Sequence, residues 1–124
     1  MVRCLKKHGF ENLILKNRSE LDLMNQEKTE LFFRTEKPYG VICSAAKVGG
    51  IYANHVSPAD FLYENLTIQN NLIHFSHKYN VKYLLFLGSA CIYPKYADQP
   101  IKEDSLLSGT LELTNEAYAI AKIA

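Results

Sequence analysis

Apolar side chains recur at steps of three and four residues through the middle of the chain, which is the period of an amphipathic α-helix. The helix predicted there begins at Ser57 and Pro58, residue types that favour the N-cap and the first turn. Its inner face carries Phe61, Leu62, Asn65, Ile68, Leu72 and Phe75. A second helix is predicted at the end of the chain, where Thr114 or Asn115 supplies the N-cap.

Two shorter helices are predicted earlier in the chain. Val2 and Leu5 mark the end of a helix over residues 1–8, which Gly9 terminates. After a loop over residues 19–23, another helix faces inward with Leu31 and Phe32 and ends at Pro38.

Three short apolar runs lie between these helices and predict buried strands over residues 13–15, 41–46 and 81–87. Residues 47–54 and 88–113 are predicted to be mostly loop. Strands that alternate with helices are typical of an α/β fold with a doubly wound parallel sheet. Both ends of the chain fall inside predicted helices, so we expect a piece of a longer protein, although helices that fray at natural termini give the same pattern.

Composition excludes several classes of protein. The chain has 124 residues, of which 48% are hydrophobic, and a net charge of +1 that gives no strong field for nucleic acid or an anionic membrane. The longest apolar run, over residues 83–93, is too short to span a bilayer. Three cysteines in no paired or metal-binding pattern, and four histidines without one, predict a reduced, cytoplasmic protein and no metal site.

Tyr118 and Lys122 are the strongest candidates for chemistry. On a helix, residues four apart share a face, and an ammonium beside a phenol favours the phenolate. Such a tyrosine can donate a proton to a carbonyl oxygen during hydride delivery. By itself the pattern is weak, because a solvated tyrosine and lysine would look the same.

Ser89 and Cys91 follow the last predicted strand, and ligands of open parallel sheets bind at the carboxyl ends of strands. If the backbone stays extended, the two side chains project to the same side. Ser89 could then bind a substrate carbonyl and orient Tyr118, and Cys91 could act as an acid or base. The alternative is a small polar residue in a turn beside an inert cysteine.

Basic and polar residues follow the first predicted strand at Lys16, Asn17 and Arg18. In dinucleotide-binding folds an arginine near this point suits the 2′-phosphate of NADP, whereas an acidic residue suits NAD. The pattern therefore favours NADP over NAD as the cofactor. On the charges alone, a solvated basic loop that binds no cofactor is an equally good interpretation.

Several longer motifs make a resemblance specific. The segments SAAKVGGI at 44–51, PADF at 58–61, LLFLGSACIYPK at 84–95, QPI at 99–101 and TNEAYAIAKIA at 114–124 resemble the GDP-L-fucose synthases, a family of extended short-chain dehydrogenase/reductases. The resemblance implies a partial NADP-binding Rossmann domain over residues 1–124, lacking its first strand, its glycine-rich turn and the sugar-nucleotide domain. It also implies NADPH-dependent 3,5-epimerisation and C4 reduction of GDP-4-keto-6-deoxy-D-mannose, in the cytoplasm and by a homodimer when full length.

The resemblance also assigns residues. Ser89, Tyr118 and Lys122 match the family's catalytic triad, and Cys91 matches its epimerisation cysteine, whose partner histidine lies beyond residue 124. Further positions match contacts to NADP(H): Arg18, Asp22, Leu23, Leu87, Gly88, Ser89, Ala90 and Lys122. The chain departs from the family pattern at Ala90, usually serine, at Leu113, usually proline, and at His55, usually asparagine.

The absent first strand has a physical consequence. We expect a gap between the strand at Leu13 and the strand at Val81, where each buried unpaired backbone group costs about 1–3 kcal/mol. The alternatives to the family's activity are a truncated, non-catalytic product that binds a full-length subunit, and another sugar-nucleotide epimerase or dehydratase of the superfamily. Cys91 beside Ser89 argues against the latter, because chemistry by hydride transfer alone needs no second acid there.

Overall fold

The computed structural model describes all 124 residues as five α-helices, three short 3-10 helices and two strands. In chain order the helices and strands are α1 (Val2–Lys7), α2 (Gln26–Glu36), β1 (Gly40–Cys43), α3 (Ile51–Val56), α4 (Pro58–Lys78), β2 (Tyr83–Phe86) and α5 (Glu116–Ile123). The 3-10 helices are η1 (Ala90–Ile92), η2 (Glu103–Ser105) and η3 (Leu113–Asn115).

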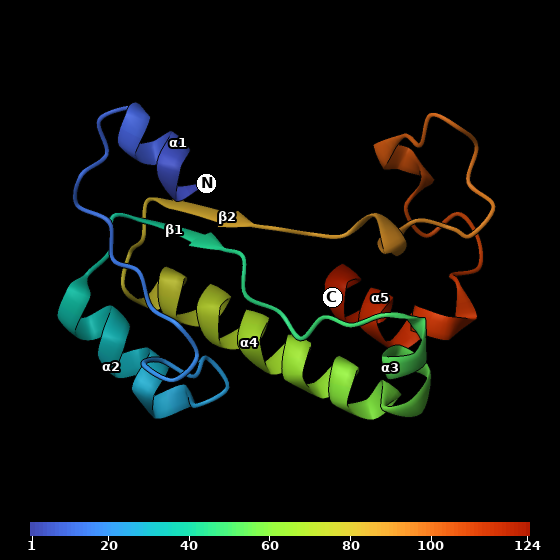
Figure 1. The fold of residues 1–124 in the computed structure, drawn as a ribbon, viewed down its shortest axis with the longest axis horizontal. Helices are drawn as coiled ribbons and strands as arrows, with labels where there is room; N and C mark the ends of the chain where they lie inside the picture. The colour runs from blue at the N-terminus through green and yellow to red at the C-terminus, as the bar shows by residue number, and fades with distance from the viewer.

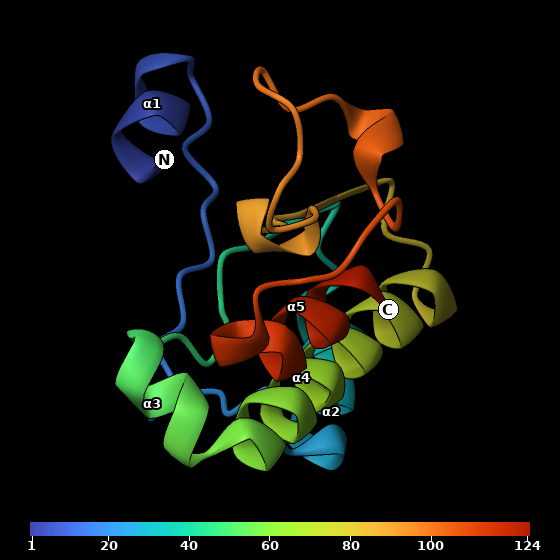
Figure 2. The same ribbon diagram turned by 90° about the vertical axis from the view of Figure 1, so that its right-hand side faces the viewer.

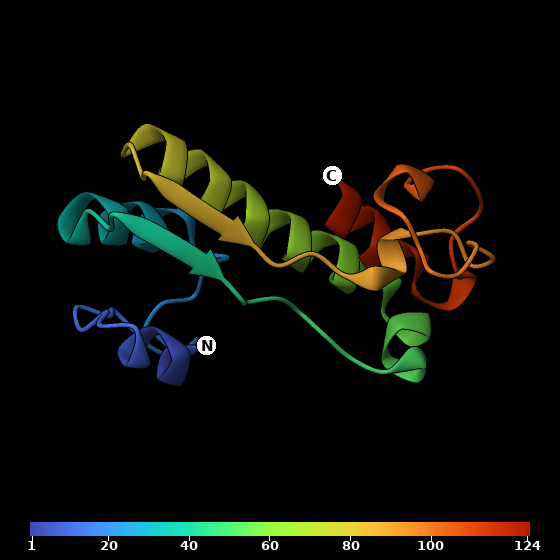
Figure 3. The same ribbon diagram turned by 90° about the horizontal axis from the view of Figure 1, so that it is seen from above.

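The two strands form a parallel sheet in which Gly40 pairs with Tyr83 and Cys43 with Phe86. Helices α2 and α4 lie on one face of this sheet (Figure 1). Seen from above, both strands point toward the end of the molecule that holds α3, α5 and the loops after β2 (Figure 3). The α/β class with a parallel sheet is therefore confirmed, as a partial Rossmann-like fold.

The core lies between the sheet and the two helices beneath it. Its buried members are Phe33 of α2, Cys43 of β1, and Ile68, Leu72 and Phe75 of α4. The three- and four-residue spacing along α4 thus predicts its buried face correctly. For α2 the expected face is wrong, because Phe33 is buried and Leu31 is 51% exposed. The far end of α4 packs against α5 (Figure 2), where Phe61 and the small residues Ala119 and Ala121 are buried.

Asn25 shows why α2 begins where it does. Its side chain accepts a hydrogen bond from the Lys28 backbone N–H at 2.9 Å, which satisfies a donor that the helix itself leaves free. The helix ends at Lys37, whose backbone is left-handed with φ of 45°, and Pro38 follows, as predicted. Gly9, predicted to terminate the first helix, lies just past α1 with φ of 84°.

The strand predicted over residues 13–15 is wrong. The structure has no strand there, because a β-ladder needs a hydrogen-bonded neighbour and these residues have none. The expected gap beside the strand at Val81 is also misplaced. That strand pairs with β1, and it is β1 that lies on the side of the N-terminal segment (Figure 3).

Three smaller expectations are corrected as well. Strand β1 ends at Cys43 rather than at Ala46, and the loop predicted over 47–54 contains the start of α3. Ser57 and Asn115 do occupy N-cap positions, of α4 and α5, but neither side chain makes a capping hydrogen bond. Thr114 lies in η3 rather than at the cap.

Much apolar surface remains exposed in this arrangement. Only 14 of the 124 residues are buried, and Leu85 of the sheet is 51% exposed. None of the helices combines the length and the hydropathy that crossing a membrane requires.

Candidate functional site

The candidate site lies beyond the carboxyl ends of the two strands, where loops from each strand meet α5. An open pocket of about 220 Å³ lies there, lined by Val48, Gly49, Asn54, Cys91, Asn115 and Tyr118. The first two come from the loop after β1, Cys91 from η1 after β2, and Tyr118 from α5. Carboxyl ends of parallel strands are the ordinary place for ligands in doubly wound sheets.

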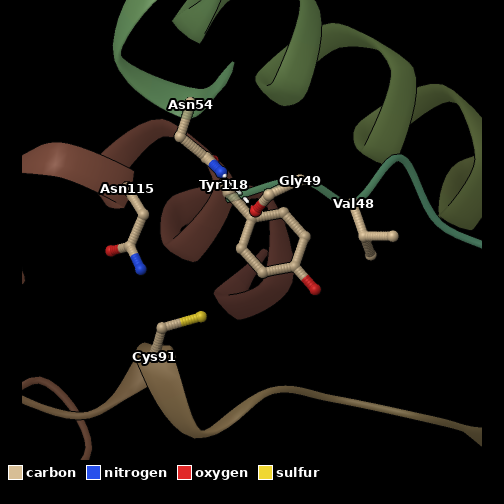
Figure 4. A pocket seen from close by; sticks show the side chains of 6 residues that line it. All are labelled: Val48, Gly49, Asn54, Cys91, Asn115 and Tyr118. Atoms are coloured by element: carbon tan, nitrogen blue, oxygen red, sulfur yellow. Dashed lines mark hydrogen bonds between the residues drawn. The ribbon is translucent and has the colours of Figure 1, made fainter. Parts of the chain in front are cut away.

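Two predicted catalytic residues, Cys91 and Tyr118, therefore share one pocket (Figure 4). The Tyr118 ring packs edge-on against Phe61 of α4, with ring centroids 6.4 Å apart. The sulfur of Cys91 points into the space beside the ring. Their spacing in the sequence could not predict that they lie together, because 26 residues of mostly irregular chain separate them.

Ser89, a third predicted catalytic residue, contacts Cys91. Its Oγ lies 2.7 Å from the Cys91 Sγ, and either group can act as the donor. The backbone of Ser89 is extended, with φ of −150° and ψ of 145°, before the chain turns into η1. The two side chains do meet as expected, but the 3-10 helix brings them together, because the backbone does not stay extended beyond Ser89.

Lys122, the fourth, lies one helical turn after Tyr118 on α5 and contacts the end of β2. Its Nζ donates to the Leu87 carbonyl oxygen at 3.1 Å and lies 4.3 Å from the centroid of the Phe86 ring. Burial lowers the pKa of the Lys122 ammonium. The Tyr118 hydroxyl makes no hydrogen bond to Lys122 or Ser89 in this structure.

A buried asparagine that the sequence interpretation treated as part of an apolar face holds the wall of the pocket in place. Asn65 of α4 accepts a hydrogen bond from the Lys47 backbone N–H at 2.9 Å and donates to the Lys47 carbonyl at 3.0 Å. It also donates to the Phe61 carbonyl at 2.7 Å. A polar side chain in the middle of a helical apolar stripe was the signal that could have revealed this role.

Gly49 is required where the same loop crosses α4. A Cβ at this position would lie 2.9 Å from the Phe61 ring and 3.0 Å from the Ala53 Cβ, so a side chain would force the Phe61 ring or the loop to move. Asn54 of α3 reinforces the turn, because its amide nitrogen donates to the carbonyls of Gly49 and Gly50 at 3.0 and 3.1 Å. Sequence reasoning placed Asn54 in a loop and gave it no role.

The predicted cofactor residues fall into two groups. Leu87, Gly88, Ser89, Ala90 and Lys122 lie together at the carboxyl end of β2, close to the pocket. Arg18, Asp22 and Leu23 lie in the segment before α2 and do not line it. Arg18 forms ion pairs with Asp22 at 3.9 Å and with Glu64 at 3.4 Å, and its side chain remains mostly exposed.

The NAD dependent epimerase/dehydratase family has a model that matches residues 1–124, and the chain belongs to this family. It is 61% identical over 124 residues to the putative GDP-L-fucose synthase 2 of Arabidopsis thaliana. It is 53% identical over 122 residues to the GDP-L-fucose synthase of Escherichia coli strain K12. These matches cover 100% and 98% of the chain, which spans 38% of the length of either relative.

Solved structures show the same fold. The GDP-mannoheptose C4 reductase MlghC of Campylobacter jejuni, with NADP bound, matches with a TM-score of 0.93 and 49% identity. A GDP-L-fucose synthetase of Naegleria fowleri bound to NADP matches with a TM-score of 0.87 and 28% identity. Each match covers 98% of this chain, and 36% and 39% of the respective solved chains.

Proposed function

We propose that this chain provides the reducing and epimerising residues of an enzyme that converts GDP-4-keto-6-deoxy-D-mannose to GDP-L-fucose. The observation that carries the proposal is the shared pocket of Cys91 and Tyr118, with Ser89 bonded to Cys91 and Lys122 one turn from Tyr118. The sequence identity to GDP-L-fucose synthases supports the same substrate. A truncated regulatory product, the alternative kept open by the sequence, gains no support.

The residues at the end of β2 fit a nicotinamide cofactor. A Cβ on Gly88 would meet nothing within 4 Å, so a planar ring can approach the backbone there. The Lys122 ammonium beside the Leu87 carbonyl places positive charge at the same edge. Arg18 supplies an exposed guanidinium for a 2′-phosphate, which favours NADP over NAD. The positions predicted to hold the cofactor would therefore contact NADP, and residues 1–124 would form part of the domain that binds it.

NADPH, when bound, supplies the hydride that reduces C4 of the sugar. Tyr118 donates its phenolic proton to the C4 oxygen, so that the ketone becomes a hydroxyl. Ser89 binds that oxygen, and Lys122 stabilises the phenolate that Tyr118 leaves behind. The carbonyl makes the C–H bonds of the neighbouring carbons acidic, and Cys91 would transfer a proton on one face of these carbons. Inversion needs a second group on the opposite face, the role of the histidine that the family resemblance places beyond residue 124.

A second substrate is favoured by one observation. The chain is 49% identical to a solved chain named as a GDP-mannoheptose C4 reductase. Both substrates are GDP-linked sugars reduced at C4, so the assignment of Tyr118 and Lys122 is the same for either. Turnover of GDP-4-keto-6-deoxy-D-mannose compared with the corresponding 4-keto-heptose separates the two.

The test uses a chimera, in which this chain replaces the 122 aligned residues of the Escherichia coli relative. Tyr118→Phe should lower C4 reduction, followed as NADPH oxidation, by roughly 10²–10⁴-fold, because the proton donor is lost. Tyr63→Phe is the matched control, since Tyr63 is 65% exposed on α4, and it should leave the rate unchanged. An inactive parent chimera, or a Tyr118→Phe variant as fast as the parent, would contradict the proposal.

We also propose that the intact protein is a cytoplasmic homodimer that takes neither nucleic acid nor membrane as a partner. Exposed apolar side chains on α3, among them Ile51 and Tyr52, support a subunit contact. The net charge of +1 gives no field for a polyanion. Light scattering should give twice the protomer mass for the chimera, and a single protomer mass would refute the dimer.

A further inference from the structure

Asn115 occupies the N-cap position of α5 but does not cap it. The side chain of an N-cap asparagine ordinarily accepts a hydrogen bond from a backbone N–H of the first helical turn. Asn115, with φ of −135° and ψ of 19°, makes no such bond. Asn25 of α2 provides the comparison within this chain, since it has an extended backbone and bonds the Lys28 N–H at 2.9 Å.

The Asn115 side chain instead lines the pocket with Cys91 and Tyr118. Its amide group lies between Asn54 and Cys91 in Figure 4. The Oδ1 atom is buried and accepts no hydrogen bond from any residue. A buried amide oxygen without a donor is costly, and such exceptions concentrate where a ligand completes the network.

Asn54 provides a second, independent observation on the same pocket. The residue is 6% exposed, and its amide nitrogen is fixed by the carbonyls of Gly49 and Gly50. Those two bonds determine which end of the amide is oxygen, and that Oδ1 is also buried without a donor. Asn54 and Asn115 therefore both line the pocket that holds the proposed acid and base, and the nitrogen end of the Asn115 amide is the one that faces Cys91 (Figure 4).

We propose that Asn115 is a substrate-positioning residue that binds the hydroxyl at C3 of the sugar, next to the ketone, with Asn54 completing the polar wall. This inference rests on the proposed function, and it assigns part of the substrate's recognition. The unsatisfied atom of Asn115 is an acceptor, so it needs a donor such as a hydroxyl, which a ketone oxygen cannot provide. The last torsion of an asparagine side chain is soft, so a rotation turns either end of the Asn115 amide toward the ligand.

The geometry also explains why such a site would discriminate between the substrate and an analogue that lacks the C3 hydroxyl. The Asn115 oxygen has no donor within the protein, so a hydroxyl that meets it after the amide rotates adds a hydrogen bond that the protein itself does not supply. A substrate that lacks the hydroxyl leaves the oxygen unpaired. Sites built in this way reject deoxy analogues far more strongly than apolar sites reject a missing methylene.

The test compares Asn115→Ala with Asn25→Ala in the chimera. Asn115→Ala should lower kcat/KM for GDP-4-keto-6-deoxy-D-mannose by about 10–100-fold, mostly through KM, as the loss of one hydrogen bond to substrate predicts. Its Tm should stay within about 1 °C of the parent, because no capping bond is lost. Asn25→Ala should do the reverse, with unchanged kinetics and a Tm lower by about 2 °C or more.

The 3-deoxy analogue of the substrate isolates the hydroxyl. With that analogue, the parent and Asn115→Ala should differ by less than about threefold, because the contact is absent in both. Equal losses on both substrates, or unchanged kinetics with a lowered Tm, would overturn the role of Asn115. If the parent chimera turns over neither substrate, the proposed function fails; calorimetric binding of the two GDP-sugars to parent and variant then decides the inference separately.

Discussion

The 124-residue chain expressed alone should not fold cooperatively, and the structure gives the magnitude. Its accessible surface is 8939 Å². A compact protein of its 14.1 kDa mass exposes about 6,700 Å², so about 2,200 Å² lacks a partner. The chain buries only about 56% of its unfolded surface, less than the roughly 60% typical of a domain half its length.

The free-energy consequence is large compared with the stability of a domain. If only a quarter of the excess surface is apolar, its missing burial amounts to about 14 kcal/mol at about 25 cal/mol per Å². Whole domains are stable by roughly 5–15 kcal/mol. The exposed face of the sheet and the free edge of β1 hold part of this surface; a neighbouring strand would pair with the edge, and packed helices would cover the face.

Thermal unfolding followed by near-ultraviolet circular dichroism, together with binding of a hydrophobic dye, measures this directly. We expect a broad, non-cooperative transition and strong dye binding for the chain alone, and a sharp transition for the chimera. A single cooperative transition of the isolated chain, with its Tm raised by NADPH and no dye binding, would refute the reasoning.

Two other predictions concern the chimera. Phe75→Ala should destabilise it by about 3–5 kcal/mol in urea unfolding, because Phe75 is 1% exposed in the core, whereas Phe10→Ala should change little, because Phe10 is 58% exposed. Retained stability in Phe75→Ala would place the core elsewhere. The hydrogen bond from Lys47 lowers the pKa of the Glu64 carboxyl below its unfolded value. This contribution is therefore present above about pH 4.3 and is lost as the pH falls through the folded pKa. The Tm difference between parent and Glu64→Gln should accordingly be largest near neutrality and shrink in acid; a difference that is constant with pH would contradict it.

The local sequence determined the elements whose residues interact with near neighbours. The apolar spacing from Phe61 to Phe75 predicted α4, and Pro38 and Gly9 marked the ends of two other helices, because a helix satisfies its own backbone hydrogen bonds. The prediction that failed concerns an element that depends on a distant partner. Residues 13–15 have the composition of a strand, but a strand exists only with a partner, and composition does not supply one.

The same distinction between local and distant interactions applies to the candidate site. Residue types and spacing along one helix or one strand end singled out Tyr118 with Lys122, and Ser89 with Cys91. Only the tertiary structure decided that Cys91 and Tyr118 line one pocket, and that Asn54, Asn65 and Asn115 shape it. In the sequence, Asn54 and Asn115 look like ordinary loop and cap residues, and Asn65 looks like part of the inner face of a helix. Their roles come from burial and from a pocket that distant segments of the chain build together, which a linear pattern does not encode.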